Sequence, residues 1–149
     1  MISLKFKRVR PDEDSDLVVP SAQTTGAAGL DICAGVKAPL TIKPGAICLV
    51  PTGWAVAIPD GYEGQIRPRS GLALKKGLTL VNTPGTIDSD YRGEMMLPMI
   101  NLGPEPVVIQ RGDRVAQMVI SRVERPEILV VEELDDTERG AGGFGSTSV

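Results

Sequence analysis

The sequence predicts an all-β barrel or sandwich. Its 149 residues include 17 glycines and 12 prolines, and these place turn signals about every 8–12 residues between short apolar runs, a spacing typical of such folds. Hydrophobic residues make up 42% of the chain but aromatic residues only 3%, so aliphatic side chains must fill the core. A chain of this length can bury such a core as one domain without disulfides or metal ions.

The expected strands are apolar or alternating runs, each bounded by turn residues. Turn signals such as Lys43-Pro44-Gly45, Pro59-Asp60-Gly61 and Arg111-Gly112-Asp113 separate them. Pro98 lies within one run, and because proline lacks an N–H group it indicates an edge strand or a bulge. In chain order the predicted strands are residues 4–9, 29–34, 40–42, 47–51, 54–58, 62–67, 78–81, 94–101, 107–109, 114–122 and 128–133.

One short helix is predicted over residues 70–76, with Gly77 at the position that closes a helix. A helix start favours anions, because its N–H groups and dipole face outward there. The segment Arg67-Pro68-Arg69-Ser70-Gly71 therefore predicts an anion site, with Gly71 allowing close approach of the backbone. The alternative is that Ser70 only caps the helix and the arginines are solvated.

Charge and cysteine content exclude several classes of protein. The net charge of −3 argues against sequence-independent binding of nucleic acid or of a membrane surface. No apolar run approaches the ~20 residues of a membrane span, and residues 1–10 do not resemble a signal peptide. Cys33 and Cys48 are too few for a zinc set, which predicts free thiols and a cytoplasmic location.

The chain contains no histidine, which excludes Ser-His-Asp and Cys-His catalysis and histidine–zinc sites. Its chemistry must use carboxylates, amides, guanidinium groups and a bound ion. Asp31 lies among small and apolar residues, where it could close a turn or hold the water shell of Mg²⁺. Gln117 lies in an apolar strand, where it either faces solvent or turns inward to bind a water or a phosphate oxygen.

The segment 80–94 joins an apolar run to two acids and a tyrosine. Pro84-Gly85 predicts a tight reversal with a positive φ at the glycine, and hence a hairpin. Asn82 has the donors and acceptor needed to pair with a pyrimidine edge. Tyr91 could pack beneath a sugar, and Asp88 could orient and deprotonate a water. The alternative is an ordinary surface hairpin with a solvated acidic end.

The glycine-rich end, residues 140–145, matches the GxGxxG pattern but cannot be a dinucleotide fingerprint. Too few residues follow for the helix that such a site requires. Arg139 beside it is a suitable partner for phosphate oxygens, and Phe144 has no core to join, so it could stack on a ligand base. The alternative is a plain disordered tail, since the residues from 135 onward cannot bury enough surface to order themselves.

Taken together and in this order, these segments resemble the five motifs of the trimeric dUTPase family, the deoxyuridine triphosphate nucleotidohydrolases. One such motif would be weak, but five in order across nearly the whole chain are specific. The matching segments are residues 28–31 (AGLD), 69–73 (RSGLA), 82–93, 111–117 (RGDRVAQ) and 139–147 (RGAGGFGST).

The resemblance implies a jelly-roll homotrimer with three active sites at the subunit contacts. Each site would take the first, second and fourth motifs from one chain, the segment 82–93 from a second and the tail from a third. Residues 1–134 would form the jelly-roll domain, and residues 135–149 a flexible arm that closes a neighbour's site. The implied reaction is hydrolysis of dUTP to dUMP and pyrophosphate, with Mg²⁺ carried by the triphosphate. It would remove dUTP from the DNA precursor pool and supply dUMP for dTMP synthesis.

The resemblance also implies roles for single residues. Asp88 would be the general base, aligning water for attack on the α-phosphorus, and Gln117 would help to hold that water or a phosphate oxygen. Asp31 would act on Mg²⁺ through water. Tyr91 would exclude ribose. The residues expected to bind substrate are Arg69, Ser70, Gly71, Asn82, Thr86, Ile87, Asp88, Tyr91, Met96, Arg139, Phe144, Gly145 and Ser146.

Three other functions fit parts of the sequence. A dCTP deaminase of the same fold usually carries a second serine and a further arginine where this chain has Gly71 and residues 72–74, and it lacks the tail with Phe144. A regulator that binds nucleotide without catalysis is disfavoured because every proposed catalytic position is filled. A purely structural β-trimer would explain the core but not Asp88, Arg139 or Phe144.

Overall fold

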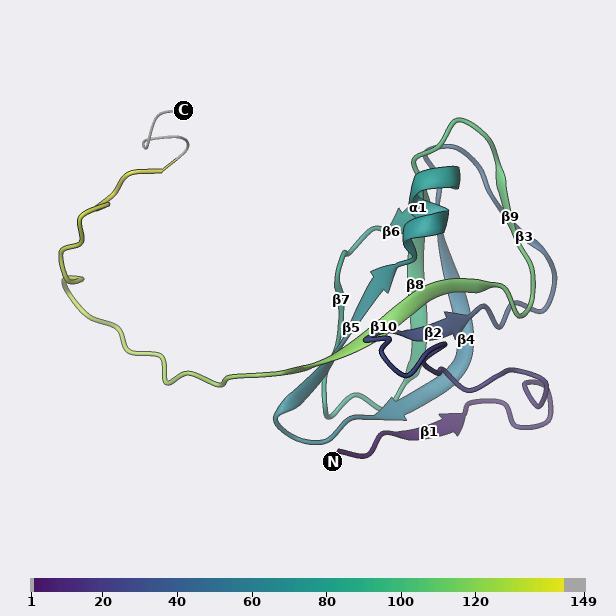
Figure 1. Cartoon of the computed structure of the whole chain (residues 1–149), viewed down its shortest axis with the longest axis horizontal. Coiled ribbons are helices and arrows are strands. Elements are labelled where there is room, and N and C mark those ends of the chain that lie inside the picture. Colours follow the sequence, from purple (N-terminus) through teal and green to yellow (C-terminus); the bar gives the residue numbers. More distant parts are fainter. Residues whose placement is uncertain (1, 144–149) are drawn as a thin grey trace.

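The computed structural model describes residues 2–143 and contains ten β-strands and one short helix over that range (Figure 1). The predicted all-β jelly-roll class with one short helix is confirmed. The elements in chain order are β1 (Lys5–Arg8), β2 (Leu30–Cys33), β3 (Leu40–Ile42), β4 (Ile47–Ala57), β5 (Tyr62–Pro68), α1 (Ser70–Lys76), β6 (Leu78–Leu80), β7 (Gly85–Ile87), β8 (Glu94–Asn101), β9 (Val107–Ile109) and β10 (Arg114–Arg122).

The strands pair into three antiparallel sheets around one core. One sheet has the order β1-β4-β8-β6, the second β2-β10-β5-β7, and β3 pairs with β9. Strand β8 alternates half-buried and fully buried positions, as expected for a strand with one face on a core. The core is aliphatic, as predicted; its largest fully buried hydrophobic side chains are Ile32, Ile42, Val50, Val56, Leu78, Met95, Leu97, Met99, Val115 and Met118.

A β-bulge in β10 determines which of its side chains face outward. The pairing of β10 with β2 shifts between Arg114 and Ala116, so Val115 and Ala116 are consecutive and both buried. Arg114 and Gln117 therefore both lie on the outer face of the sheet. Gln117 is opposite Asp31 of β2 on one side and Arg67 of β5 on the other, which places three polar side chains in one row.

The segment 80–94 is not the predicted hairpin. Strand β6 pairs with β8 in one sheet, whereas β7 pairs with β5 in the other, so the chain crosses between sheets here. Gly85 begins β7 and is absent from the positive-φ glycines of the described residues. Burial explains the difference, because β6 is anchored in the core by Leu78 and Leu80 while Gly85 packs under Ile66.

Two further strand predictions need correction. Residues 47–57 form one strand, with a register shift between Pro51 and Ala55 where the sequence predicted a break. Pro98 lies in β8, an interior strand of its sheet. It is tolerated because its carbonyl faces the end of β6 and accepts a hydrogen bond from Val81; the missing N–H faces the same side, where the ladder stops.

Helix α1 begins directly after β5, which places its first turn at the sheet edge. Arg69, not Ser70, occupies the N-cap position, and it makes no side-chain capping bond. The interpretation of Ser70 as the cap is therefore wrong. Gly77 closes the helix with φ +64° and donates to the carbonyl of Ala73, as predicted.

Ion pairs fasten the N-terminal segment to the barrel. Arg10 forms a two-pronged pair with Glu94 at the start of β8, at 2.8 and 2.9 Å. The hydrogen bond from Arg10 lowers the pKa of Glu94, and the backbone N–H of Gly53 lowers it further. Arg111 similarly joins Asp14 and Asp16. The contacts of Glu94 fix the end of the segment 80–94 to Arg10 and to Gly53 of β4.

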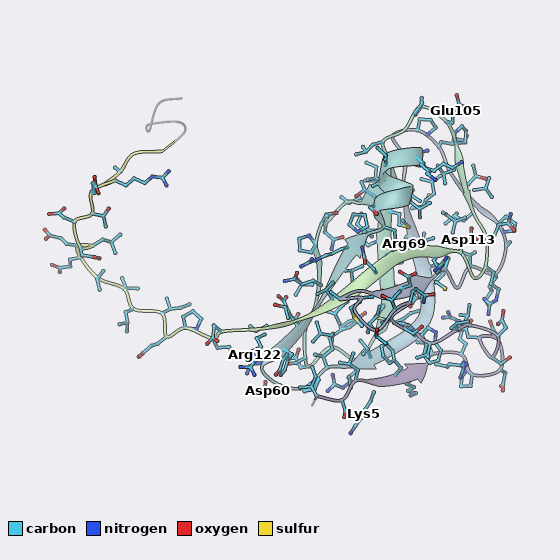
Figure 2. All side chains as sticks on the ribbon, in the orientation of Figure 1. Lys5, Asp60, Arg69, Glu105, Asp113 and Arg122 are labelled. Carbon is cyan, nitrogen blue, oxygen red and sulfur yellow. The ribbon has the colours of Figure 1, made fainter. Side chains whose placement is uncertain are left out.

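Beyond β10 the described chain extends away from the barrel as an arm, residues 123–143 (Figures 1 and 2). The predicted strand 128–133 is wrong, because this run has no strand and its side chains are exposed, Val130 at 98%. Its β-branched residues favour a strand, but no neighbouring strand supplies hydrogen bonds. The division between a domain of residues 1–134 and an arm of 135–149 stays a prediction.

Two other expectations concern the cysteines and membrane insertion. Cys33 and Cys48 are free thiols, as predicted, and burial raises the pKa of Cys33. Within residues 2–143 the structure contains no helix long and apolar enough to cross a membrane.

Candidate active site

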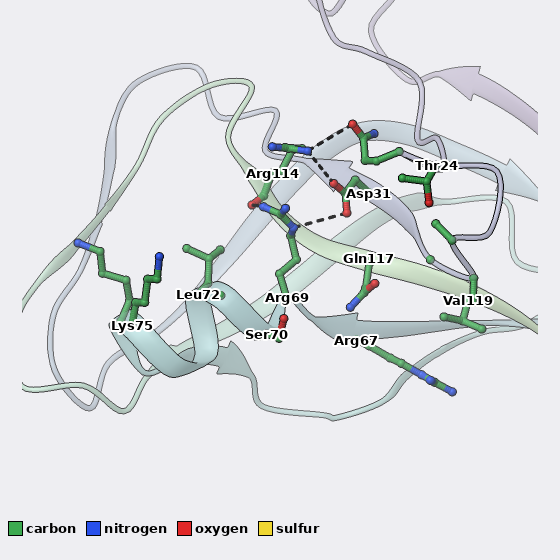
Figure 3. Close-up of a pocket in the computed structure, with 16 residues that line it drawn as sticks. Thr24, Asp31, Arg67, Arg69, Ser70, Leu72, Lys75, Arg114, Gln117 and Val119 are labelled. Carbon is green, nitrogen blue, oxygen red and sulfur yellow. Dashed lines mark hydrogen bonds and ion pairs between the residues drawn. The ribbon is translucent and has the colours of Figure 1, made fainter.

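A cavity of about 770 Å³ lies beside the start of α1, over the outer face of β2, β10 and β5 (Figure 3). The loop before β2 forms another wall, through Gln23, Thr24 and residues 27–29. One carboxylate and five cationic side chains line the cavity, although the whole chain is acidic. Such a concentration of positive charge is suited to a polyanion. The charged residues are Asp31, Arg67, Arg69, Lys75, Lys76 and Arg114.

Asp31 holds two of these arginines against the cavity wall. Its Oδ1 lies 3.4 Å from Nε of Arg69, and its Oδ2 lies 3.2 Å from Nη1 of Arg114 (Figure 3). Arg69 also donates to the carbonyl of Arg114 at 3.0 Å. The Asp31 side chain is 13% exposed, so this ion pairing is partly shielded from solvent. Two guanidinium groups are thus oriented before any ligand binds.

Gln117 lies on the outer face of the sheet, so the inward alternative is wrong, but it is half-buried on the floor of the same cavity and not free in solvent. Its Nε2 donates to the carbonyl of Pro68 at 3.0 Å, and its amide lies over Gly29. Only one of the two Nε2 hydrogens is needed for the Pro68 bond. The second hydrogen leaves the amide able to bind a water or an anionic oxygen.

Ser70 and Gly71 form the exposed first turn of α1 at the cavity rim. The first helical hydrogen bonds are donated by Leu72 and Ala73 to the carbonyl of Arg69. The N–H groups of Ser70 and Gly71 precede these bonds and are available to a ligand. A Cβ at Gly71 would meet no atom within 4 Å, so the space beside it is open.

The cavity is poorly suited to a metal ion held by protein alone. Among residues 2–143, no group of three or more aspartate, glutamate, cysteine or histidine side chains could hold one. Asp31 is the only acid of the cavity lining, and two arginines already pair with it. Mg²⁺ commonly keeps several waters and takes its other ligands from phosphates. The residues therefore fit an Mg²⁺ that arrives with phosphate ligands.

Asp88 does not line this cavity. It follows β7, which pairs with β5, whereas Gln117 lies on β10 at the other side of β5. The two strands β7 and β10 are thus two spacings, about 10 Å, apart, and along β5 Ile87 lies opposite Gly64 whereas Gln117 lies opposite Arg67. Asp88 instead lines a second cavity of about 630 Å³, together with Asp60, Glu63 and Arg125. The structure of one chain therefore does not bring the two predicted catalytic residues together.

The other predicted residues of the segment 82–93 lie on β7 or in the loops on either side of it. Thr86 and Ile87 belong to β7, and Asn82 lies beside Gly85. Thr83 and Pro84 come closer to the cationic cavity, since they share a third cavity with Ser70 and Gln117. Asn82, Asp88 and Tyr91 are all exposed.

The turn after Asp88 is nevertheless well defined. The backbone N–H of Tyr91 donates to the carbonyl of Asp88 at 3.2 Å, and its hydroxyl donates to the carbonyl of Glu94 at 2.9 Å. Arg92 closes the turn by donating to Ser89 and Tyr91 carbonyls. Gly93 is required here, because a Cβ would overlap the Tyr91 ring. The ring is thus held in place although it is exposed.

Met96 and the arm residues lie apart from the cationic cavity. Met96 is half-buried on β8, opposite Pro51. Arg139 lies in the arm, where its Nε donates to the carbonyl of Gly142. The predicted contacts of Phe144, Gly145 and Ser146 lie outside the described residues.

Sequence reasoning missed Gly29, Lys75, Lys76 and the pairing of Arg114 with Asp31. Arg114 belongs to the motif 111–117, but its pairing with Asp31 depends on the bulge in β10, and a bulge is a matter of strand register that the sequence does not indicate. The two lysines lie in the last turn of the predicted helix, and Arg69 directly precedes that helix. This clustering of cations on one short helix is a signal that could have assigned the lysines to the anion site. Gly29 gave no signal beyond its place before Asp31.

Comparisons with known proteins agree with this picture. The dUTPase family model matches residues 15–148. The chain is 57% identical to the deoxyuridine 5'-triphosphate nucleotidohydrolase of Caulobacter vibrioides, over 99% of this chain and 96% of that protein. It is 55% identical to the protein of the same name from Caldanaerobacter subterraneus, over 99% and 100% of the two chains. The structure of a Staphylococcus bacteriophage 80alpha dUTPase with dUPNHPP superposes with a TM-score of 0.83, at 27% identity and 99% coverage of both chains.

Proposed function

Because the chain belongs to the dUTPase family, we propose that it hydrolyses dUTP to dUMP and pyrophosphate, with water attacking the α-phosphorus. The observation that carries this proposal is the cationic cavity, in which Asp31, Arg69, Ser70, Gly71 and Gln117 come together. A triphosphate requires such a concentration of positive charge and N–H donors. The reaction removes dUTP from the DNA precursor pool and supplies dUMP for dTMP synthesis, in the cytoplasm.

The phosphates bind over the start of α1. Arg69 and Arg114 provide charge-assisted hydrogen bonds, and the N–H groups of Ser70 and Gly71 bind phosphate oxygens. Phosphoryl transfer needs positioning and charge neutralisation more than covalent catalysis by the protein. A site without histidine can therefore perform it.

Bound with the triphosphate, Mg²⁺ would supply neutralisation of charge on the phosphate oxygens. Asp31 would hold the metal through water, which agrees with its being the only acid among the described residues that line the cavity. Since both carboxylate oxygens now pair with arginines, those pairs must loosen when the loaded substrate enters.

The water is activated by Asp88 of a neighbouring chain. Asp88 orients the water and accepts its proton, while the second amide hydrogen of Gln117 steadies the water or a phosphate oxygen. Asn82 and residues 86–87 bind uracil and sugar, and Tyr91 excludes a 2′-hydroxyl. Asp88 and Gln117 come from two chains in this proposal because they line different cavities of one chain.

A homotrimer, with sites at the subunit contacts, provides that neighbour. Its support in this chain is an exposed apolar patch on the outer face of β4 and β8. Ile47 and Leu49 on β4 are 59% and 57% exposed, and they lie opposite Ile100 and Pro98 of β8. Such a face is expected to be covered by another protein surface.

The arm supplies the last part of the site, from the third chain. Residues 123–143 extend away from their own barrel, which agrees with a role on another subunit. Arg139 would clamp the terminal phosphate and Phe144 would stack on uracil. Removing residues 139–149 should lower turnover about a thousandfold while leaving a trimer of the same melting temperature. Glu138→Ala, next to the deletion, is the matched control, and a fully active truncated protein would refute the closing arm.

The reaction itself is tested by pyrophosphate release from dUTP, dCTP, dTTP and UTP, with and without Mg²⁺. We expect release from dUTP alone, and only with the metal. Ammonia release from dCTP would instead indicate the deaminase alternative. Binding of dUTP without turnover would indicate the regulator.

Shared sites are tested by mixing two variants of strongly lowered activity, Asp88→Asn and Gln117→Ala, and refolding them together. If each site takes Asp88 from one chain and Gln117 from another, random mixing should restore about a quarter of wild-type activity. If both residues act within one chain, the mixture stays as inactive as its parents. Light scattering should give three times the 15.8 kDa of one chain.

A further inference from the structure

We propose that Gly29 is a positioning residue, whose missing side chain creates the space that holds the amide of Gln117. This inference rests on the proposed function, because it concerns the glutamine assigned to the attacking water or a phosphate oxygen. Gly29 itself contacts neither substrate nor metal in the proposal. It acts through Gln117.

The space above Gly29 is filled by the Gln117 side chain. A Cβ built at position 29 would overlap Oε1 of Gln117, and it would lie 3.1 Å from Cδ and 3.3 Å from Cβ of the same residue. Rotating the amide alone would move Oε1 but would leave the close contacts with Cδ and Cβ in place. An alanine would therefore displace Gln117 from its present rotamer.

Backbone conformation does not explain the glycine. Gly29 is not among the positive-φ glycines of the described chain, so an L-residue could adopt its backbone angles without strain. What position 29 excludes is a side chain, and the three atoms nearest to an added Cβ all belong to Gln117.

Displacing Gln117 would have two consequences. Its Nε2 would lose the 3.0 Å bond to the carbonyl of Pro68, which immediately precedes Arg69 at the start of α1. Its second amide hydrogen would no longer point to the same place in the cavity. A misplacement of about 1 Å at a reacting centre can cost about 100-fold in rate.

The first experiment compares Gly29→Ala with Gly26→Ala. Gly26 lies in the same loop, is exposed, and would have no atom within 4 Å of an added Cβ. We expect Gly29→Ala to lower kcat for dUTP by about 10–100-fold with little change in KM, and Gly26→Ala to behave as wild type. Equal activity of the two variants would overturn the proposal.

The second experiment is a double-mutant cycle with Gln117→Ala. Removing the glutamine side chain vacates the space, so Gly29→Ala should have no further effect in that background. A purely structural role of Gly29 would instead lower activity and melting temperature equally in both backgrounds. Additive effects would therefore refute a role through Gln117.

A third measurement does not depend on catalysis. In a ¹⁵N-correlated NMR spectrum, the side-chain amide signals of Gln117, assigned by their loss in Gln117→Ala, should shift in Gly29→Ala and stay in place in Gly26→Ala. Unchanged signals would overturn the inference even if the wild type hydrolyses dUTP. If the wild type does not hydrolyse dUTP but the Gln117 signals shift in Gly29→Ala, the proposed function is rejected, whereas the contact between Gly29 and Gln117 is supported.

Discussion

The cationic cavity and the segment 82–91 are two halves of one proposed site, and a single chain builds them very differently. The cavity is organised by contacts across neighbouring strands: Asp31 pairs with Arg69 and Arg114, and Gln117 bonds to Pro68. The segment 82–91 lies at the far edge of the same sheet, where Asn82, Asp88 and Tyr91 are exposed.

The difference agrees with a division of the proposed chemistry between chains. The oppositely charged side chains of the cavity, Asp31 with Arg69 and Arg114, all belong to one chain, and their mutual attraction orients them. The base and sugar side is locally ordered by the turn from Asp88 to Glu94, but Asp88 lines a different cavity from the phosphate-binding residues. In the proposed trimer, phosphate binding is therefore prepared within one chain, whereas base selection and attack use a neighbour.

The largest effect should come from Asp88→Asn. Losing the general base should reduce kcat by about 10³-fold, while the dissociation constant of a non-hydrolysable dUTP analogue changes little, because phosphate binding belongs to the other half. Asp90→Asn is the control, since Asp90 is assigned no role. Loss of analogue binding with normal turnover per bound substrate would show that the two halves are not separable in this way.

A smaller effect is expected on the phosphate half from Arg114→Gln. Removing one oriented guanidinium should weaken binding of the same analogue about tenfold or more, since charge-assisted hydrogen bonds are the strong ones, as measured by titration calorimetry. Arg122→Gln is the matched control, because Arg122 lies on the same strand but stacks over Tyr62. Equal affinities of the two variants would remove Arg114 from the site.

Tyr91→Ala should act on selectivity rather than on rate. Without the ring, the ratio of kcat/KM for dUTP to that for UTP should fall about tenfold or more. Tyr91→Phe keeps the ring but loses the hydrogen bond to the carbonyl of Glu94, so it should keep most of the discrimination. If both variants discriminate like wild type, the sugar is selected elsewhere.

The smallest effect should be on stability, through Glu94→Gln. Breaking the two-pronged pair with Arg10 should cost about 2 kcal/mol of unfolding free energy near neutral pH. The pKa of Glu94 is lowered in the folded protein, so its contribution is complete above the ordinary value near 4.5 and disappears as the pH falls through the lowered value. Urea unfolding of both proteins at neutral and acid pH measures this, and an equal difference at the two pH values would contradict it.

Much of the fold could be predicted because turn residues are local signals. The bounds of β3, β8, β9, β10 and α1 follow from glycines and prolines at their ends, and alternation on β8 indicates its buried face. The run 128–133 shows the limit of this reasoning, because β-propensity cannot say whether a partner strand exists. The predicted hairpin over residues 80–94 was wrong for the same reason, because which strands pair depends on packing of the complete core and not on the turn alone.

The candidate site was only partly predictable. The residue types of Asp31, Arg69, Ser70, Gly71 and Gln117 pointed to phosphate chemistry, and the structure places all five at one cavity. The contact of Asp31 with Arg114 depends on a bulge, and the contact of Gly29 with Gln117 depends on register between strands. Neither is encoded in a local pattern, so both required the three-dimensional structure.

The exposed arm makes activity more vulnerable than the fold. Extended, accessible backbone is the form that proteases cleave, and within the described arm Arg139, followed by Gly140, offers such a bond. One cut there would separate the proposed closing residues from a barrel whose sheets and ion pairs remain whole. Loss of function would then be governed by proteolysis of a single segment, at a rate independent of the unfolding of the barrel.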